Sequence, residues 1–177
     1  GTYGTLVLSA ATGAYTYTPN NAAINALTAN NFESFTFGVS DGTVTTTANL
    51  VVNLVAANDT PSLQTPAAIT ITDTSATDNF APVTGSLVAM DVDANTTLTY
   101  IIDGITAVGG IATKVGTYGT LVLSAATGAY TYTPNNAAIN ALTANNSETF
   151  IFGVSDGMVT TTANLVVNLV AANDTPI

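Results

Sequence analysis

The acidic residues best suited to chemistry lie in three short segments of the chain. Asp91 and Asp93 are separated by one residue, Asn58 is followed directly by Asp59, and Asp156 stands between Ser and Gly. Carboxylates that gather in one place repel one another unless a cation neutralises them. Oxygen ligands supplied by irregular loops suit Ca²⁺ better than Mg²⁺, which requires a nearly ideal octahedron. These five residues therefore predict a structural calcium site.

The predicted site does not follow the EF-hand pattern. A loop that starts at Asp91 would need Gly at its sixth position and Glu at its twelfth, where this chain has Thr96 and Ile102. For any one of these acids the alternative is an ordinary turn, which is the commonest place for Asp and Asn. The group as a whole favours calcium. The remaining acids of this part of the chain are expected in solvated turns: Asp73, Asp78, Asp103 and Glu148.

Composition excludes most other chemistry. The chain has no His, no Cys and one basic residue, Lys114, against eleven acids, which gives a net charge of −10. Without imidazole, thiolate or guanidinium groups we expect no enzyme activity. Nucleic acid is not an expected partner, because phosphate binding needs clustered Lys and Arg. No run of 18 apolar residues is present, so direct membrane insertion is not expected either.

The first third of the chain is repeated near its end. Residues 1–61 recur at 116–176 with 57 identities in 61 positions, and the period is 115 residues. A repeat this close indicates a tandem array, whose function should be sought at the joints between modules. The repeat also gives equivalents of the candidate ligands in incomplete junctions: Asp41, Asn173 and Asp174.

Alternation of apolar and polar residues predicts seven strands and almost no helix. One short helix is expected at 137–142, after Pro134. Short antiparallel strands at this spacing predict an all-β immunoglobulin- or cadherin-like sandwich, in preference to a small barrel or a solenoid. The predicted strands span 68–72, 83–90, 98–102, 120–124, 130–133, 149–155 and 159–169.

The segment Asn58-Asp59-Thr60-Pro61 marks a module boundary, because Pro cannot donate to a sheet after a long apolar strand. We therefore predict a complete module over 62–177, which ends in the next linker. Residues 1–61 would supply only the last four strands of another module and should be marginally stable alone. Strand order then places Asp91, Asp93 and Asp156 at the pole of the complete module where its linker arrives.

Several segments resemble the VCBS repeats, which are cadherin-like modules of giant secreted bacterial adhesins of the repeats-in-toxin type. The resemblance rests on 116–123 (GTYGTLVL), 128–134 (GAYTYTP), 152–157 (FGVSDG) and 173–176 (NDTP). It implies type I secretion, a stalk on the bacterial cell surface and Ca²⁺ at module junctions. The calcium-binding motifs of cadherins correspond to Asn58-Asp59 and to Asp91-Val92-Asp93, although Ala stands where the leading Asp of the cadherin linker would be, which implies fewer ions per junction.

The expected function is that of a structural extender, stiffened by calcium, which supports cell adhesion and biofilm formation. Its partners would be the neighbouring modules of the same chain. The absence of Cys allows either a reduced cytoplasm or export without disulfides, and the low charge favours export. Such sites would hold the array rigid outside the cell, where Ca²⁺ is plentiful.

Two other functions remain open from the sequence. The charged fraction of 7% is low beside the ~25% of ordinary domains, which fits a subunit of an extracellular filament, sheath or surface layer, packed against other copies. A carbohydrate- or surface-binding adhesin domain could instead use tyrosines as a stacking platform. Alternation places Tyr130 and Tyr132 on one sheet face, where core packing is favoured over that role.

Overall fold

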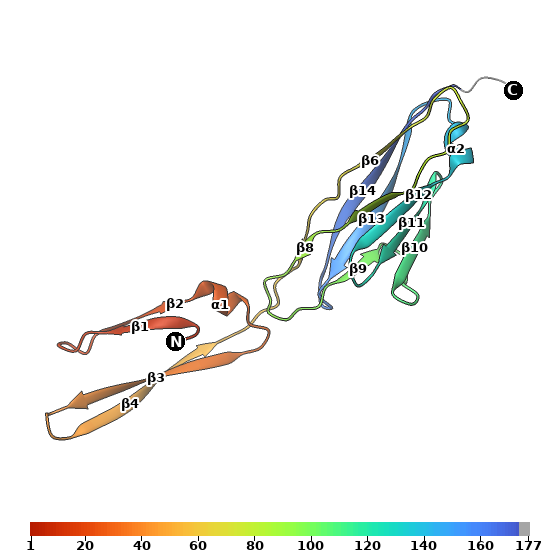
Figure 1. Ribbon diagram of the computed structural model, residues 1–177. Coiled ribbons are helices and arrows are strands. Elements are labelled where there is room, and N and C mark those ends of the chain that lie inside the picture. The colour runs from red at the N-terminus through yellow and green to blue at the C-terminus, as the bar shows by residue number, and fades with distance from the viewer. Residues whose placement is uncertain (174–177) are drawn as a thin grey trace. The chain divides into compact units, whose positions relative to one another are not determined.

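The computed structural model describes residues 1–173, which form two compact units (Figure 1). The first unit comprises Gly1–Asp59 together with Val92–Asn95, and the second comprises Thr60–Asp91 and the chain from Thr96 onward.

The second unit is built from two four-stranded sheets and a short two-stranded pair. One sheet has the order β10-β11-β12-β7, the other has the order β6-β14-β13-β9, and β5 pairs with β8. Its elements are β5 (Ser62–Leu63), β6 (Ile69–Thr72), β7 (Val83–Ser86), β8 (Ala89–Met90), β9 (Thr99–Ile102), β10 (Ile111–Val115), β11 (Gly119–Ser124), β12 (Ala129–Pro134), α2 (Asn136–Asn140), β13 (Asn146–Ser155) and β14 (Thr160–Val170).

The core lies between the two sheets because each strand turns its apolar side chains inward. In β11 every second residue is buried, and Leu121 and Leu123 are fully enclosed. The ring of Tyr132 meets Phe150 across the core with centroids 5.9 Å apart, and the rings of Tyr130 and Phe152 are 5.1 Å apart. This arrangement confirms the predicted all-β sandwich.

Two strand pairings hold β14 in the middle of its sheet. β13 and β14 form an antiparallel hairpin of ten residue pairs. β6 pairs with β14 in parallel, from Ile69 opposite Val167 to Thr72 opposite Val170. Figure 1 shows β6 and β14 side by side along the sheet. A strand near the start of the second unit is therefore joined directly to its last strand, β14.

The short helix α2 fastens the loop between β6 and β7. Asn135 caps the helix by accepting a hydrogen bond from the backbone N of Ala138. Asn140 then both accepts from the backbone N of Asp78 at 2.9 Å and donates to its carbonyl at 3.0 Å. The helix predicted at 137–142 is confirmed, two residues shorter at its end than expected.

The first unit contains two hairpins and a short helix: β1 (Gly4–Leu8), β2 (Tyr15–Pro19), α1 (Asn21–Asn25), β3 (Asn31–Ser40) and β4 (Thr45–Leu54). β1 pairs only with β2, and β3 pairs only with β4, among residues 1–173. The turn from β3 to β4 contains Gly42 at φ 96°, and its copy Gly157 has the same angle. The two hairpins therefore repeat the local structure of 116–170.

The strand predictions differ from the structure in two ways. The predicted strand 83–90 is two strands, because β7 pairs with β12, whereas the carbonyl of Val88 accepts from the backbone N of Gln64 and β8 pairs with β5. The strands β5 and β10 were not predicted. The strand β5 has only two residues, and the only buried side chain of β10 is the small Ala112, so its alternation of apolar and polar residues is weak.

Candidate functional site

Asp93 connects the turn after β8 to the linker after β4, within the first unit. Its side chain is only 6% exposed, and its Oδ2 accepts a hydrogen bond from the backbone N of Asp59 at 2.9 Å. Next to it, the backbone N of Ala94 donates to the carbonyl of Ala26 at 3.1 Å, and Asn95 adopts the left-handed conformation with φ 62°. Hydrogen bonds to a carboxylate are stronger than hydrogen bonds between neutral groups. The turn is therefore held against the linker by specific contacts.

Asn58 and Asp59 complete this group. The Nδ2 of Asn58 donates to the carbonyl of Asp59 at 2.9 Å, and Asp59 is half-buried. The structure thus brings together one amide and two carboxylates, whose possible metal-ligand atoms are oxygens. This chemistry fits a hard divalent cation such as Ca²⁺.

Asp91 and Asp156 belong to the second unit, where strand direction places their two turns at the same end. Asp91 is half-buried, and its Oδ2 is enclosed. The Oδ1 of Asp156 accepts hydrogen bonds from the backbone N of Met158 and of Val159, both at 2.7 Å. Asp156 therefore shapes its own turn, and its predicted role as a ligand stays a prediction.

Asp41 repeats that turn in the first unit. Its Oδ1 accepts from the backbone N of Thr43 and of Val44, both at 2.8 Å. These bonds, with that from Val44 contributing most, lower the pKa of the Asp41 carboxyl. The two copies thus use this Asp in the same way.

Two equivalent positions lie near the end of the described chain. Asn173 is exposed, and Asp174 lies outside the described residues. Within residues 1–173 no three acidic side chains are grouped closely enough to hold a metal ion by themselves. A calcium site at the linker would therefore depend on amide and backbone oxygens in addition to Asp59 and Asp93.

Asp73 is a buried carboxylate that sequence reasoning placed wrongly in a solvated turn. It is 4% exposed, its Oδ2 accepts from the backbone N of Ala172 at 3.3 Å, and its Oδ1 is enclosed without a hydrogen-bond partner among the described residues. The alternation of β6 carries the signal for this position, because Ile69, Ile71 and Asp73 fall on the same inward face. Asp73 therefore stands beside the next linker.

Glu148 is also not a solvated turn residue. It accepts a hydrogen bond from the Tyr132 hydroxyl at 2.6 Å and another from the backbone N of Tyr118 at 3.2 Å. Burial, and then this bond to Glu148, raise the pKa of Tyr132. Glu33 makes the same contacts with Tyr17 and Tyr3 at 2.6 and 3.1 Å. The pair is a structural device present in both copies.

Residues 55–168 match the family model described as bacterial Ig domain. A search of curated proteins found no match. None of the helices in residues 1–173 has the length and apolar character needed to span a membrane.

Several solved structures resemble the chain over most of its length. Human CDH23 EC21-23 is 14% identical with a TM-score of 0.46, and the match covers 94% of this chain and 50% of that one. Mouse cadherin-23 EC22-24 is 13% identical with a TM-score of 0.43, covering 100% and 51%. An endo-fucoidan hydrolase from glycoside hydrolase family 107 is 22% identical with a TM-score of 0.36, covering 96% and 23%. The chain thus spans about half or less of each of these proteins.

Proposed function

Because the chain belongs to the bacterial Ig domain family, we propose that it is a structural extender of a large, secreted bacterial cell-surface adhesin, stiffened by calcium at the junctions between modules. The close internal repeat supports an array of such modules, of the VCBS type exported by type I secretion. The function would be to hold an adhesive tip away from the cell during attachment and biofilm formation.

The contact between Asp59 and Asp93 carries this proposal. A linker that serves only as a tether needs no buried carboxylate, because burying a charge without compensation costs free energy. Here Asp93 is buried and bonded to the linker backbone at Asp59, whose own carboxylate adds a second negative charge nearby. A cation at this place would compensate both charges.

A bound Ca²⁺ would supply the positive charge that this group of oxygen ligands lacks. Asp59 and Asp93 would hold it, and Asn58 would add its amide oxygen; a role for Asp91 stays a prediction from the sequence. Extracellular calcium sites bind at ~10⁻⁴ to 10⁻³ M, so such a junction would be filled outside the cell and empty in a cytosol low in Ca²⁺. Calcium bound only by the folded chain would add its binding free energy to stability.

Asp73 extends the proposal to the following junction. Its enclosed Oδ1 lies beside the linker that continues into Asn173 and Asp174, the counterparts of Asn58 and Asp59. We expect this carboxylate to contribute from the module that precedes each linker.

The test compares the melting temperature and small-angle scattering of the chain in 10 mM CaCl₂ and in chelator. We expect a higher melting temperature and a narrower distribution of dimensions with calcium. Asp93→Asn keeps an oxygen that can accept from Asp59 but removes the charge, so it should abolish the calcium response while leaving the stability in chelator nearly unchanged. Asp103→Asn, at an exposed position, is the control for net charge. An unchanged melting temperature of the native chain up to 10 mM CaCl₂ would disprove the calcium junction.

The two alternative functions are not supported equally. Tyr130 and Tyr132 are 8% and 0% exposed, so in the complete module they pack in the core, as favoured from the sequence, and offer no platform for a sugar. A filament subunit stays an alternative, supported by the low charged fraction of 7%.

A further inference from the structure

The chain contains three Asp-Gly pairs, a dipeptide that can rearrange its own backbone. Two of them, Asp41-Gly42 and Asp156-Gly157, are copies of each other in the repeat, and the third is Asp103-Gly104. In such a pair the backbone N of Gly can attack the carboxyl carbon of Asp, and glycine has no side chain to hinder the approach. The three pairs share this chemistry, so their surroundings decide which of them reacts.

The pair Asp156-Gly157 is held by three hydrogen bonds. The Oδ1 of Asp156 accepts from the backbone N of Met158 and of Val159, both at 2.7 Å. The backbone N of Gly157 donates to the Oγ of Ser155 at 3.1 Å. The amide that would attack and the carboxyl that would be attacked are thus both engaged, and the reaction would have to break these bonds.

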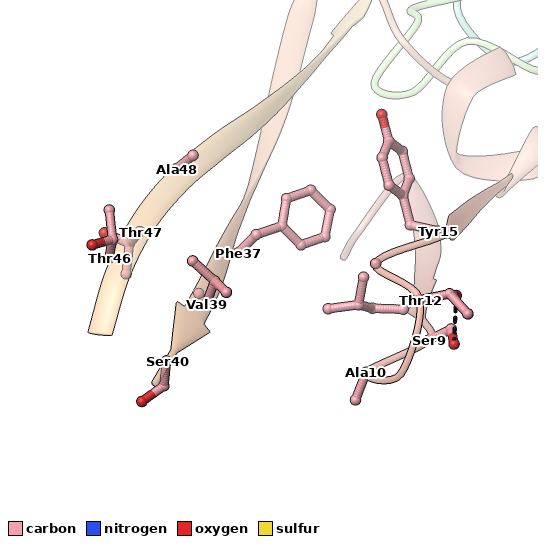
Figure 2. Close-up of a pocket in the computed structure, with 13 residues that line it drawn as sticks. Ser9, Ala10, Thr12, Tyr15, Phe37, Val39, Ser40, Thr46, Thr47 and Ala48 are labelled. Carbon is pink, nitrogen blue, oxygen red and sulfur yellow. Dashed lines mark hydrogen bonds between the residues drawn. The ribbon is translucent and has the colours of Figure 1, made fainter. Parts of the chain in front are cut away.

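The pair Asp41-Gly42 is held in the same way. Figure 2 shows Ser40 at the end of β3, where its Oγ accepts from the backbone N of Gly42 at 3.1 Å. The Oδ1 of Asp41 accepts from the backbone N of Val44 and of Thr43, and these bonds lower the pKa of the Asp41 carboxyl. Because water leaves only from the neutral acid, a lower pKa also slows this reaction.

The pair Asp103-Gly104 lies in a different kind of turn. The turn follows β9 and is closed by a bond from the backbone N of Ile105 to the carbonyl of Ile102 at 3.0 Å. Both Asp103 and Gly104 are exposed. Among residues 1–173 no hydrogen bond reaches the carboxylate of Asp103, and the backbone N of Gly104 has no acceptor. Both reacting groups are therefore free.

We propose that Asp103-Gly104 is a site of spontaneous isoaspartate formation, with water as the only co-reactant. A bond forms from the Gly104 N to the Cγ of Asp103, and the carboxyl hydroxyl leaves with the amide proton as water, which gives a five-membered succinimide. Water then attacks the main-chain carbonyl carbon of Asp103 and the bond from that carbon to the Gly104 N breaks. The water's hydroxyl stays on the carbon and its hydrogen goes to the nitrogen. The chain then runs through Cβ and Cγ, and its mass is unchanged.

Lys114, the single base of the chain, lies beside the carbon that the water attacks. Its Nζ donates to the main-chain carbonyl of Asp103 at 3.1 Å. A cationic donor at this oxygen polarises the carbonyl and stabilises the negative charge that develops when water adds. In the product the same oxygen belongs to a carboxylate, so the neutral acceptor of Lys114 becomes a charged one.

The isomer adds one backbone atom to a turn that is anchored in the core. Ile102 is 1% exposed, and Ile105 packs against the core from its rim. The added atom should lengthen or break the bond that closes the turn. Amide exchange at Ile105 should therefore be faster in the isomerised chain.

The test incubates the full chain for weeks in a mildly acidic buffer below its melting temperature. Chelator is present so that no metal protects Asp156. After digestion with pepsin, chromatography separates isomers of equal mass and fragmentation locates the isoaspartate. We expect it to form at Asp103 at least about tenfold faster than at Asp156 or Asp41, because ring closure there breaks no hydrogen bond.

Synthetic peptides of residues 39–44, 101–106 and 154–159 are the control for local sequence. They should react at similar rates, because none of them keeps the folded turn. Equal rates at the three sites in the folded chain would overturn the proposal. So would a folded chain that forms no isoaspartate at Asp103 while the peptide 101–106 converts.

A matched pair of serine variants tests the cause of the protection. Ser155→Ala removes the acceptor of the Gly157 N and should raise the rate at Asp156 by about threefold or more. Ser147→Ala removes an exposed hydroxyl from the same strand and should leave that rate unchanged. Equal rates at Asp156 in the two variants would contradict the explanation by hydrogen bonds.

Two further variants address the reacting position itself. Asp103→Glu should abolish the isomer at this position, because a ring with one more atom closes far more slowly. An isomer of equal mass that persists in Asp103→Glu would place the rearrangement elsewhere and overturn the assignment. Lys114→Met should lower the rate of isoaspartate formation at Asp103 by about threefold. An unchanged rate would contradict the role of Lys114.

Discussion

Residues 1–59 and 116–170 have nearly the same sequence and the same hairpins, yet only the second set is buried. The helix caps are alike, with Asn20 and Asn135 each accepting from a backbone N at 3.3 Å. The tyrosine–glutamate bonds are 2.6 Å in both. Local sequence therefore determines turns, caps and short-range pairs, whereas burial depends on the separate segment 62–115. The difference between the copies measures what that segment contributes.

The largest expected effect separates Phe152 from its copy Phe37. Phe152 is fully buried, so Phe152→Ala should lower the free energy of unfolding of the second unit by about 3–5 kcal/mol. Phe37 is half-buried beside an open pocket, and Phe37→Ala should cost less than about 1.5 kcal/mol. Residue-resolved hydrogen exchange in urea measures both. Equal losses would show that the first unit is covered in solution.

A smaller difference is expected from the glutamates. Glu148→Ala would leave the buried hydroxyl of Tyr132 without its acceptor, which should cost about 1–3 kcal/mol. Glu33→Ala should cost less, because water can replace the lost acceptor at the more exposed Tyr17. Tyr132→Phe combined with Glu148→Ala tests the cause, since removing both partners should recover part of the loss. No recovery would mean that Glu148 stabilises the fold mainly through Tyr118.

Stability at alkaline pH should also depend on Tyr132 and on its copy Tyr17. Burial and the bond to Glu148 raise the pKa of Tyr132, and chiefly the bond to Glu33 raises the pKa of Tyr17 to about 12. Both folded-state pKa values exceed the unfolded value of ~10. The stabilisation is therefore complete below pH ~10 and is lost as pH rises through the folded-state values. Melting temperature against pH should fall above pH ~10, and less steeply in Tyr132→Phe; an unchanged slope would assign the loss to other tyrosines.

The smallest effect is expected at a position where the copies differ. Met158 is 77% exposed in the turn after β13, and its copy is Thr43. The neighbouring glycines Gly157 and Gly42 share φ 96°, so the turns have the same conformation. Met158→Thr should change stability by less than about 0.5 kcal/mol in thermal unfolding. A larger change would show that Met158 makes a contact the two copies do not share.

Most of the fold could be predicted because its signals are local. Alternation identified the long strands β13 and β14, and Pro134 followed by Asn residues marked the start of α2. The strand β10 was missed because Ala112 is its only buried residue, and the break between β7 and β8 depends on a change of partner strand, from β12 to β5. A pattern within one strand carries no information about such a partner.

The candidate site was less predictable than the fold for the same reason. Residue types suggested Asp59 and Asp93, but the bond between them joins positions 34 residues apart. Asp73 was predicted to be exposed because acidic side chains usually are exposed. The alternation of β6 instead places it on the inward face of the sheet. Two hydrogen bonds within the turn account for one carboxylate oxygen of Asp156. The presence of an acid at this position therefore does not by itself indicate a metal ligand.

The parallel pairing of β6 with β14 has a mechanical consequence for the second unit. A load that pulls the module from Pro61 at one end and from Ala172 at the other draws these neighbouring strands in opposite directions along their length. All the hydrogen bonds between Ile69–Thr72 and Val167–Val170 then bear the force together, instead of opening one after another. Forced unfolding is governed by the unfolding rate, so this shear clamp would set how long the module survives under tension.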